Sequence, residues 1–192
     1  MSKLSIELVP QTAWWSNVRS NVTRAQWEVC KRYANAKTGG VCIVCGDVGQ
    51  NQNRKHAVEA HEIWDYDDER QIQTLVDIVP LCPRCHQVKH IGRSQAVMSP
   101  YMYDQLVRHL CRVNGWWNSF AIASNSPNAE DTRHAQRYIN TCFEVWAERS
   151  RHAWELDITF LKMLGLEVEA KNQGSFQPHL VSDWVGDKIV PE

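Results

Sequence analysis

The sequence contains no long apolar run, and this absence excludes a membrane-spanning helix, which needs about 20 consecutive apolar residues. The first residues also lack the charged region, apolar region and cleavage site that mark a secretory signal peptide. Disulfides persist mainly in oxidising compartments, so we expect the seven cysteines to stay reduced. The chain is therefore expected to be cytoplasmic, with no membrane partner.

An excess of positive charge is absent as well. The chain has 21 lysines and arginines against 22 aspartates and glutamates, so nucleic acid can bind only through a local basic patch. No internal repeat or low-complexity stretch occurs. The chain has 192 residues, 43% of them apolar, and nine tryptophans, which is ample for the core of one or two domains.

Two Cys-x-x-Cys pairs are the clearest motif. Cys42 and Cys45 form the first pair, Cys82 and Cys85 form the second, and 36 residues from Gly46 to Leu81 separate them. Each pair can place two thiolates from one tight turn on one metal ion. The alternatives are two disulfides or four unrelated buried thiols. The missing export signal argues against disulfides, and the double pair favours a structural four-cysteine zinc site.

Two histidines follow the second pair directly, in VPLCPRCHQVKHIGR. His86 adjoins Cys85, and His90 comes four residues later. Residues four apart lie on the same face of a helix, so both imidazoles can reach one point. The segment therefore offers half of a zinc site and two ligands of a second metal site.

The 36-residue insertion contains two apolar-rich stretches, Ala57–Trp64 and Thr74–Leu81, on either side of an acidic connection. This pattern predicts a hairpin of two strands. His61 lies on the first expected strand and Asp77 on the second. The predicted order is the first Cys-x-x-Cys pair, the first strand, the second strand, the second Cys-x-x-Cys pair and a helix.

This order of residues and elements resembles the HNH endonucleases, which have the ββα-metal fold, in their four-cysteine form. The resemblance covers about residues 42–93 and is most specific at Leu81–His86. It implies a zinc-stapled α+β core in which a second divalent ion lies between strand and helix and binds the scissile phosphate. A histidine then activates water, and the ion stabilises the leaving oxygen.

By the same resemblance, His61 falls on the first histidine motif and His86 on the final histidine ligand. His90 falls where some members have a further ligand, and Asp77 falls where asparagine is usual.

The first strand can be aligned in two registers. With Ala60-His61 as the motif, His61 is the base and the preceding ligand is missing; with His61-Glu62, His61 is a ligand and Glu62 takes the base position. The candidate catalytic residues are therefore His61, Glu62, Asp77 and His86.

The second ion is expected to bind His61, His86 and His90, and Asp77 could either join them or orient His61. It would be Mg²⁺, Mn²⁺, or Ni²⁺ or Zn²⁺, and histidine-rich ligation favours a transition metal. No acidic residue occurs from Ile78 to Tyr103, whereas Arg84, Lys89 and Arg93 add positive charge around His86. These three residues are the expected contacts to DNA, although a solvated surface accounts for three charges equally well.

The chain divides into an N-terminal segment with a capping helix (1–40), an HNH-like core (41–95), a helical extension (96–170) and a tail (171–192). The N-terminal helix is predicted from a capping box, Thr23 to Gln26. The extension is expected to cover the core and to offer a surface for a protein partner or a homodimer.

Several local expectations complete this reading. Leu4–Val9 is expected to form a short strand, and Trp14-Trp15 to be core. Helices are expected to begin at Ser99-Pro100 and Ser126-Pro127, while Trp154–Leu164 fits a strand or a helix equally well.

The sequence thus predicts a metal-dependent endonuclease that hydrolyses phosphodiester bonds in DNA. The alternative is a non-catalytic zinc-stapled module that binds DNA or a protein partner. The two interpretations differ in metal content. Only the nuclease needs a second ion, and the substitution His86→Ala should abolish the binding of that ion.

Overall fold

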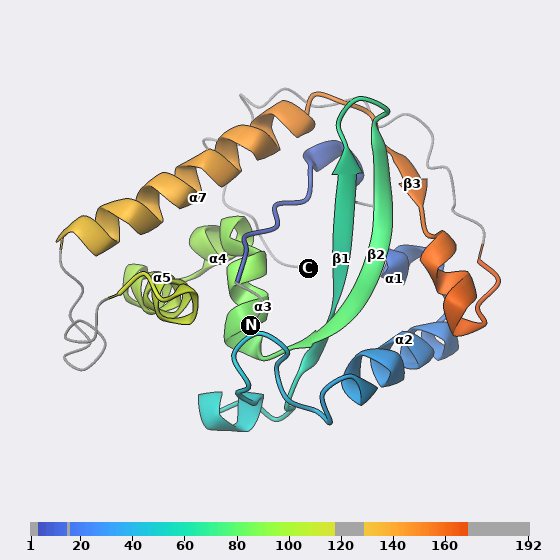
Figure 1. Ribbon diagram of the computed structural model, residues 1–192, viewed down its shortest axis with the longest axis horizontal. Helices are drawn as coiled ribbons and strands as arrows, with labels where there is room; N and C mark the ends of the chain where they lie inside the picture. Colours follow the sequence, from blue (N-terminus) through green and yellow to red (C-terminus); the bar gives the residue numbers. More distant parts are fainter. Residues whose placement is uncertain (1–3, 15, 118–128, 169–192) are drawn as a thin grey trace.

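The computed structural model describes residues 4–14, 16–117 and 129–168. Its centre is a mixed sheet of three strands in the order β1-β2-β3. β1 (Glu59–Asp67) and β2 (Ile72–Leu81) form a long antiparallel hairpin, and the short β3 (Glu155–Asp157) adds to β2 in parallel. Helices lie on both sides of this hairpin (Figure 1). The chain is therefore an α+β protein, as expected.

Two helices precede the hairpin on one side: α1 (Val18–Asn21) and α2 (Arg24–Ala36). On the other side follow α3 (Pro83–Lys89), α4 (Ile91–Val97), α5 (Pro100–Asn114) and α7 (Ala129–Arg149). Short 3₁₀ helices occur at Gln11–Ala13, Gly49–Gln52 and Thr159–Leu164. Within the described part of the chain, no helix is both long and apolar enough to cross a membrane.

The helix boundaries follow capping chemistry. The Thr23 hydroxyl accepts a hydrogen bond from the Gln26 N–H, and the Gln26 side chain accepts one from the Thr23 N–H, which confirms the capping box. Ser99 caps α5 and Pro100 takes its first position, also as expected. The expected helix start at Ser126-Pro127 lies outside the described residues.

The side chains of β2 point alternately to the two faces of the sheet, and so they contribute to two separate cores. Ile78 packs with Cys30 and Ala34 of α2, whereas its neighbour Val79 packs with Val88 of α3. Successive strand residues point to opposite faces, so each face supports its own helical layer. The second layer, on the α3 side, holds all four cysteines of the two pairs.

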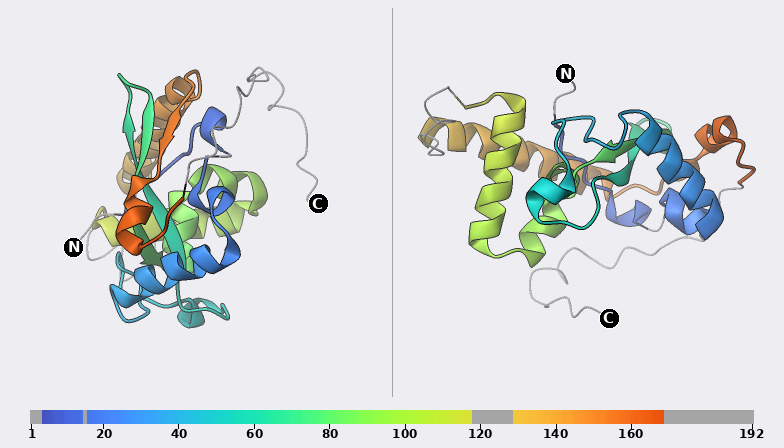
Figure 2. Two further views of the ribbon diagram at one scale, coloured as in Figure 1. Left: turned by 90° about the vertical axis from the view of Figure 1, so that its right-hand side faces the viewer. Right: turned by 90° about the horizontal axis from the view of Figure 1, so that it is seen from below.

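The hairpin tip lies beside the C-terminal end of α7, as both figures show (Figures 1 and 2). Arg149 donates hydrogen bonds to both carboxylate oxygens of Asp68 at 2.7 and 2.8 Å. Both strands extend beyond the predicted bounds into the acidic connection. Trp154–Leu164, left open above, divides into β3 and a 3₁₀ helix.

Two N-terminal expectations were wrong. Leu4–Val9 belongs to no strand, because its backbone bonds α3 instead: the Glu7 N–H donates to the Lys89 carbonyl at 2.9 Å. Trp14 is 40% exposed and donates its indole N–H to the Val9 carbonyl, so it is not core. Trp15 lies outside the described residues.

Candidate metal centres

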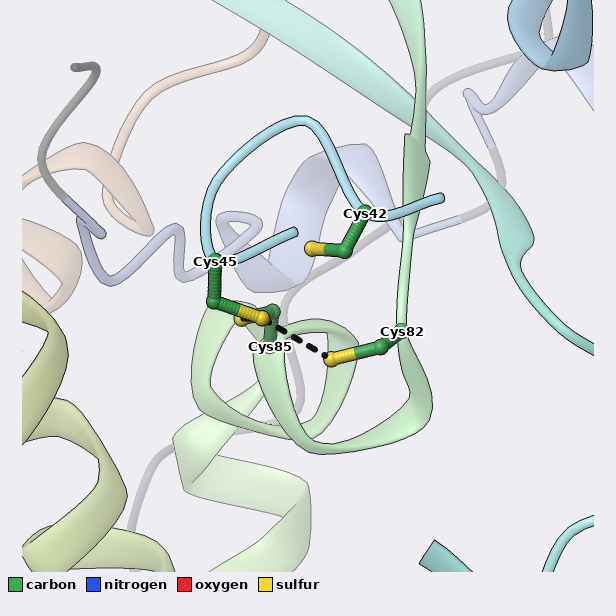
Figure 3. Close-up of side chains that lie close together, drawn as sticks. All are labelled: Cys42, Cys45, Cys82 and Cys85. Atoms are coloured by element: carbon green, nitrogen blue, oxygen red, sulfur yellow. Dashed lines mark hydrogen bonds between the residues drawn. The ribbon is translucent and has the colours of Figure 1, made fainter. Parts of the chain in front are cut away.

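The four cysteines of the two pairs converge where β2 enters α3 (Figure 3). Cys45 Sγ lies 3.6 Å from Cys82 Sγ and 3.5 Å from Cys85 Sγ. Sulfurs bound tetrahedrally to zinc at about 2.3 Å lie about 3.8 Å apart, which these distances approach. Cys42 completes the set, since one ligand atom from each residue lies within 4.8 Å of the others. The four cysteines are close enough to bind a structural zinc ion.

Backbone hydrogen bonds form a tight turn around the first Cys-x-x-Cys pair. The Cys42 N–H donates to the Asp47 carbonyl, and the Gly46 N–H returns to the Cys42 carbonyl at 2.9 Å. Gly46 has φ +73°, a conformation that glycine adopts without a Cβ clash. This tight turn brings Cys42 and Cys45 to the same side, opposite the second pair.

Crowding perturbs the four thiols. The hydrogen bond from Cys45 lowers the pKa of Cys42, and the hydrogen bond from Cys42 lowers the pKa of Cys82. The pKa values of Cys45 and Cys85 are raised, in each case chiefly by the interaction with Cys42. Because zinc binds thiolates, binding at this cluster would release protons from the thiols whose pKa is raised.

His109 contacts this cluster from the helical extension. It is buried on α5, and its Nε2 lies 3.2 Å from Cys85 Sγ. No sequence motif indicates this contact, because 24 residues separate the two positions.

Three histidines form a second cluster on the same side of the sheet. His61 lies on β1 and His86 lies on α3. His90 is the C-cap residue that follows α3 directly. One nitrogen of each lies within 4.8 Å of the others. The three ring centroids are 5.1, 5.0 and 4.9 Å apart, with interplanar angles of 70–72°. The expected histidine set is thus brought together.

This arrangement fits one metal ion. Imidazoles bound through one nitrogen at about 2.0–2.1 Å and near-tetrahedral angles have ring centroids about 5 Å apart. Three protein ligands leave a fourth position for water or substrate, which is the pattern of catalytic zinc sites. The cysteine cluster offers four ligands and leaves no such position.

Carboxylates hold two of the imidazoles. His86 Nδ1 is hydrogen-bonded to Glu59, and His61 Nε2 lies 2.9 Å from Glu7 Oε2. Glu59 lies two residues before His61 on β1 and could have been identified from the period-2 spacing of a strand. Glu7 could not, because it lies 54 residues from His61. Carboxylates on the outer nitrogen of a metal-binding histidine fix its orientation.

The pKa values suit metal binding. Burial lowers the pKa of His61 and lowers that of His90 to about 3, so both imidazoles are neutral near pH 7. The hydrogen bond from His86 lowers the pKa of Glu59 to about 2. For Glu7, burial raises the pKa, but the hydrogen bond from His61 and the charge of Lys89 outweigh it.

Glu62 does not join the histidines. It adjoins His61 on β1 and points to the opposite face, where its carboxylate accepts from the Arg19 N–H at 3.4 Å. Burial raises its pKa. The register that makes Glu62 the base therefore places that base on the wrong side of the strand.

Asp77 does not join them either. It lies where the hairpin register shifts between Ile63 and Trp64, and such an irregularity can redirect a side chain. The Asp77 carboxylate accepts from the Tyr33 hydroxyl at 3.1 Å and pairs with Lys37. It therefore ties β2 to α2.

The three expected DNA contacts divide by exposure. Arg84 and Arg93 are exposed. Lys89 is 5% exposed and donates to Glu7 and to Ser5 Oγ, so its ammonium lies inside the protein. Of these three side chains, only the two arginines are accessible to a phosphate backbone.

Comparisons with protein-family models, curated proteins and solved structures gave no match. The function proposed below is therefore based on the two clusters and on the sequence motifs that carry the resemblance.

Proposed function

We propose that the chain is a metal-dependent endonuclease of the HNH type that hydrolyses phosphodiester bonds in DNA. The observation that carries this proposal is the convergence of His61, His86 and His90 beside a separate four-cysteine cluster. A structural cysteine site and a separate histidine-lined site are what the sequence resemblance implies.

Each residue then has a defined task. His61, His86 and His90 would hold the second ion, and their convergence favours His61 as a ligand, although Glu62 does not then supply the base. A bound ion would supply Lewis acidity to a phosphoryl oxygen and to the leaving oxygen. Three nitrogen donors favour a transition metal over Mg²⁺, which prefers oxygen ligands.

DNA would approach along α3 and α4. Arg84 at the start of α3 and Arg93 in α4 are exposed on either side of His86 in sequence. Two phosphate contacts give a modest affinity that decreases with salt. Steady binding would then depend on further contacts, for which the helical extension is a candidate.

The alternative is a zinc-stapled module without catalysis, which binds DNA or a protein partner. The placement of Glu62 and Asp77 away from the histidines favours it, because the cluster then lacks two expected participants. A net charge of −1 favours the protein partner.

Plasmid cleavage separates the two readings. The zinc-loaded full chain would be supplied with Mg²⁺, Mn²⁺ or Ni²⁺, beside His86→Ala and the matched control His134→Ala, which removes an exposed imidazole of α7. We expect wild type and His134→Ala to convert supercoiled plasmid to nicked or linear forms, and His86→Ala to be inactive. Absence of cutting with every metal, or equal cutting by His86→Ala, would overturn the proposal.

A further inference from the structure

The segment before the core reaches the histidine cluster. Residues 4–10 run between α3 and β1 (Figure 1), and Leu4 and Ile6 are buried among the residues of the α3 side. The Ile6 N–H donates to the Tyr138 hydroxyl at 3.2 Å, and the Glu7 N–H donates to the Lys89 carbonyl at 2.9 Å. The backbone at Glu7 is thus fixed from both α7 and α3.

The Glu7 side chain lies between two buried groups. Its Oε2 is 2.9 Å from Nε2 of His61, whose side chain is 4% exposed, and its Oε1 pairs with Lys89. The Lys89 ammonium also donates to Ser5 Oγ at 2.8 Å, so the segment supplies both of its partners. A buried ammonium without the carboxylate would be costly, which keeps Glu7 in place.

This contact selects a tautomer of His61. A neutral imidazole carries one N–H, and a carboxylate can only accept, so the proton must lie on Nε2. Nδ1 then carries the lone pair and is the atom free to bind an ion. Glu59 acts in the same way on His86, since it accepts the hydrogen bond from Nδ1–H and leaves the lone pair on Nε2 free.

We propose that Glu7 is a positioning residue of the second metal centre, which it serves by orienting His61 and fixing its proton on Nε2. The inference rests on the proposed function of the histidine cluster. It makes residues outside the HNH-like core a working part of the site. Glu7 is not among the donors that gather within 4.8 Å of one another, so it acts through His61.

The test compares Glu7→Ala, Glu7→Gln and Tyr138→Phe in the full chain. Tyr138→Phe is the matched control, because it removes a hydrogen bond that anchors the same segment and leaves the Glu7 carboxylate intact. The cysteine site would first be saturated with zinc. Co²⁺ affinity would then be measured by titration calorimetry, and the His61 tautomer by ¹⁵N NMR before and after Co²⁺ or diamagnetic Zn²⁺ is added.

We expect protonated Nε2 in wild type, with the added ion on Nδ1. Glu7→Ala should bind Co²⁺ about 10- to 100-fold more weakly and show mixed tautomers, the range found when outer partners of metal ligands are removed. Glu7→Gln, which keeps an acceptor and loses the charge, should fall between. Tyr138→Phe should match wild type in both readouts.

Three outcomes would overturn the inference. If wild type binds Co²⁺ and Glu7→Ala binds it equally well with the same tautomer, Glu7 does not position His61. If the ion shifts Nε2 instead of Nδ1, Glu7 is displaced on binding. If wild type binds no ion at the histidines, the proposed function fails first, and the inference fails with it.

Discussion

The four-cysteine and three-histidine clusters share α3 and differ in almost every other respect. Cys85 and His86 are neighbours, yet they serve different centres because successive helix residues differ by about 100° around the axis. The cysteine cluster is closed, with four soft ligands and three of its residues at most 2% exposed. The histidine cluster has three ligands, two of them half-buried. Ligand number and access, more than position in the fold, distinguish the two clusters.

The groups around each cluster differ as well. The thiolate cluster has an imidazole nitrogen of His109 beside Cys85, which can donate to negative sulfur. The imidazole cluster has carboxylates, Glu7 and Glu59, which can only accept. His109 can thus offer an N–H to a negative sulfur, and the two carboxylates can accept the N–H of an imidazole. Each surrounding group therefore suits the ligand beside it.

The largest expected effect is on the cysteine side. Removing zinc with a chelator, or changing Cys82→Ser, should unfold the chain, because a structural zinc site contributes on the order of 10 kcal/mol. Circular dichroism and thermal melting measure this, with Cys142→Ser as the control thiol outside the cluster. A Cys82→Ser protein that keeps its zinc and its melting temperature would refute a stapling role.

The next effect decides the role of His61. If it is a ligand, as the convergence indicates, His61→Ala should weaken second-ion binding by more than about 100-fold, beyond the loss for an outer partner. His90→Ala should do the same. If His61→Ala binds the ion normally but does not cut DNA, His61 is the base, and the other register of the first strand is correct.

A smaller effect separates the two faces of β1. Glu59→Gln should weaken second-ion binding by about 10-fold, because the amide loses the charge that orients His86. Glu62→Gln should leave it unchanged, since Glu62 bonds the backbone of α1 on the other face. Titration calorimetry of zinc-saturated protein gives both values. An equal loss of second-ion affinity in the two variants would contradict the placement of Glu59 and Glu62 on opposite faces of β1.

The smallest effect concerns His109. His109→Ala should release zinc to a chromogenic chelator several-fold faster, because Cys85 loses the nitrogen at 3.2 Å. His109→Gln retains a side-chain N–H and should release zinc more slowly than the alanine variant. Identical release rates in all three proteins would show that the contact does not affect the metal.

Sequence reasoning succeeded where local geometry depends on short spacing. The Cys-x-x-Cys pairs, the four-residue step from His86 to His90, and the caps at Thr23 and Ser99 all lie within one turn of chain. Their geometry follows from local backbone rules, so each pair and the helix starts could be predicted, whereas His61 was expected at the site only because the whole motif resembles a known family.

It failed where tertiary packing decides. Glu7 and His109 reach their clusters from 54 and 24 residues away, and nothing local to either residue indicates the contact. Asp77 was expected at the site from its position in the motif, but it lies beside a shift in strand register and pairs with Lys37. Apolar and polar residues alternate in Leu4–Val9 as in a strand. Its backbone nevertheless bonds to α3 and not to the sheet.

The most direct test of two independent centres is the zinc stoichiometry of the full chain, by elemental analysis after saturation with zinc and removal of the excess. The account predicts two ions per wild-type chain, one of them released by a mild chelator, and one ion per chain in a folded His86→Ala protein. One ion per chain in both proteins would contradict the second centre, as would two tightly held ions in His86→Ala.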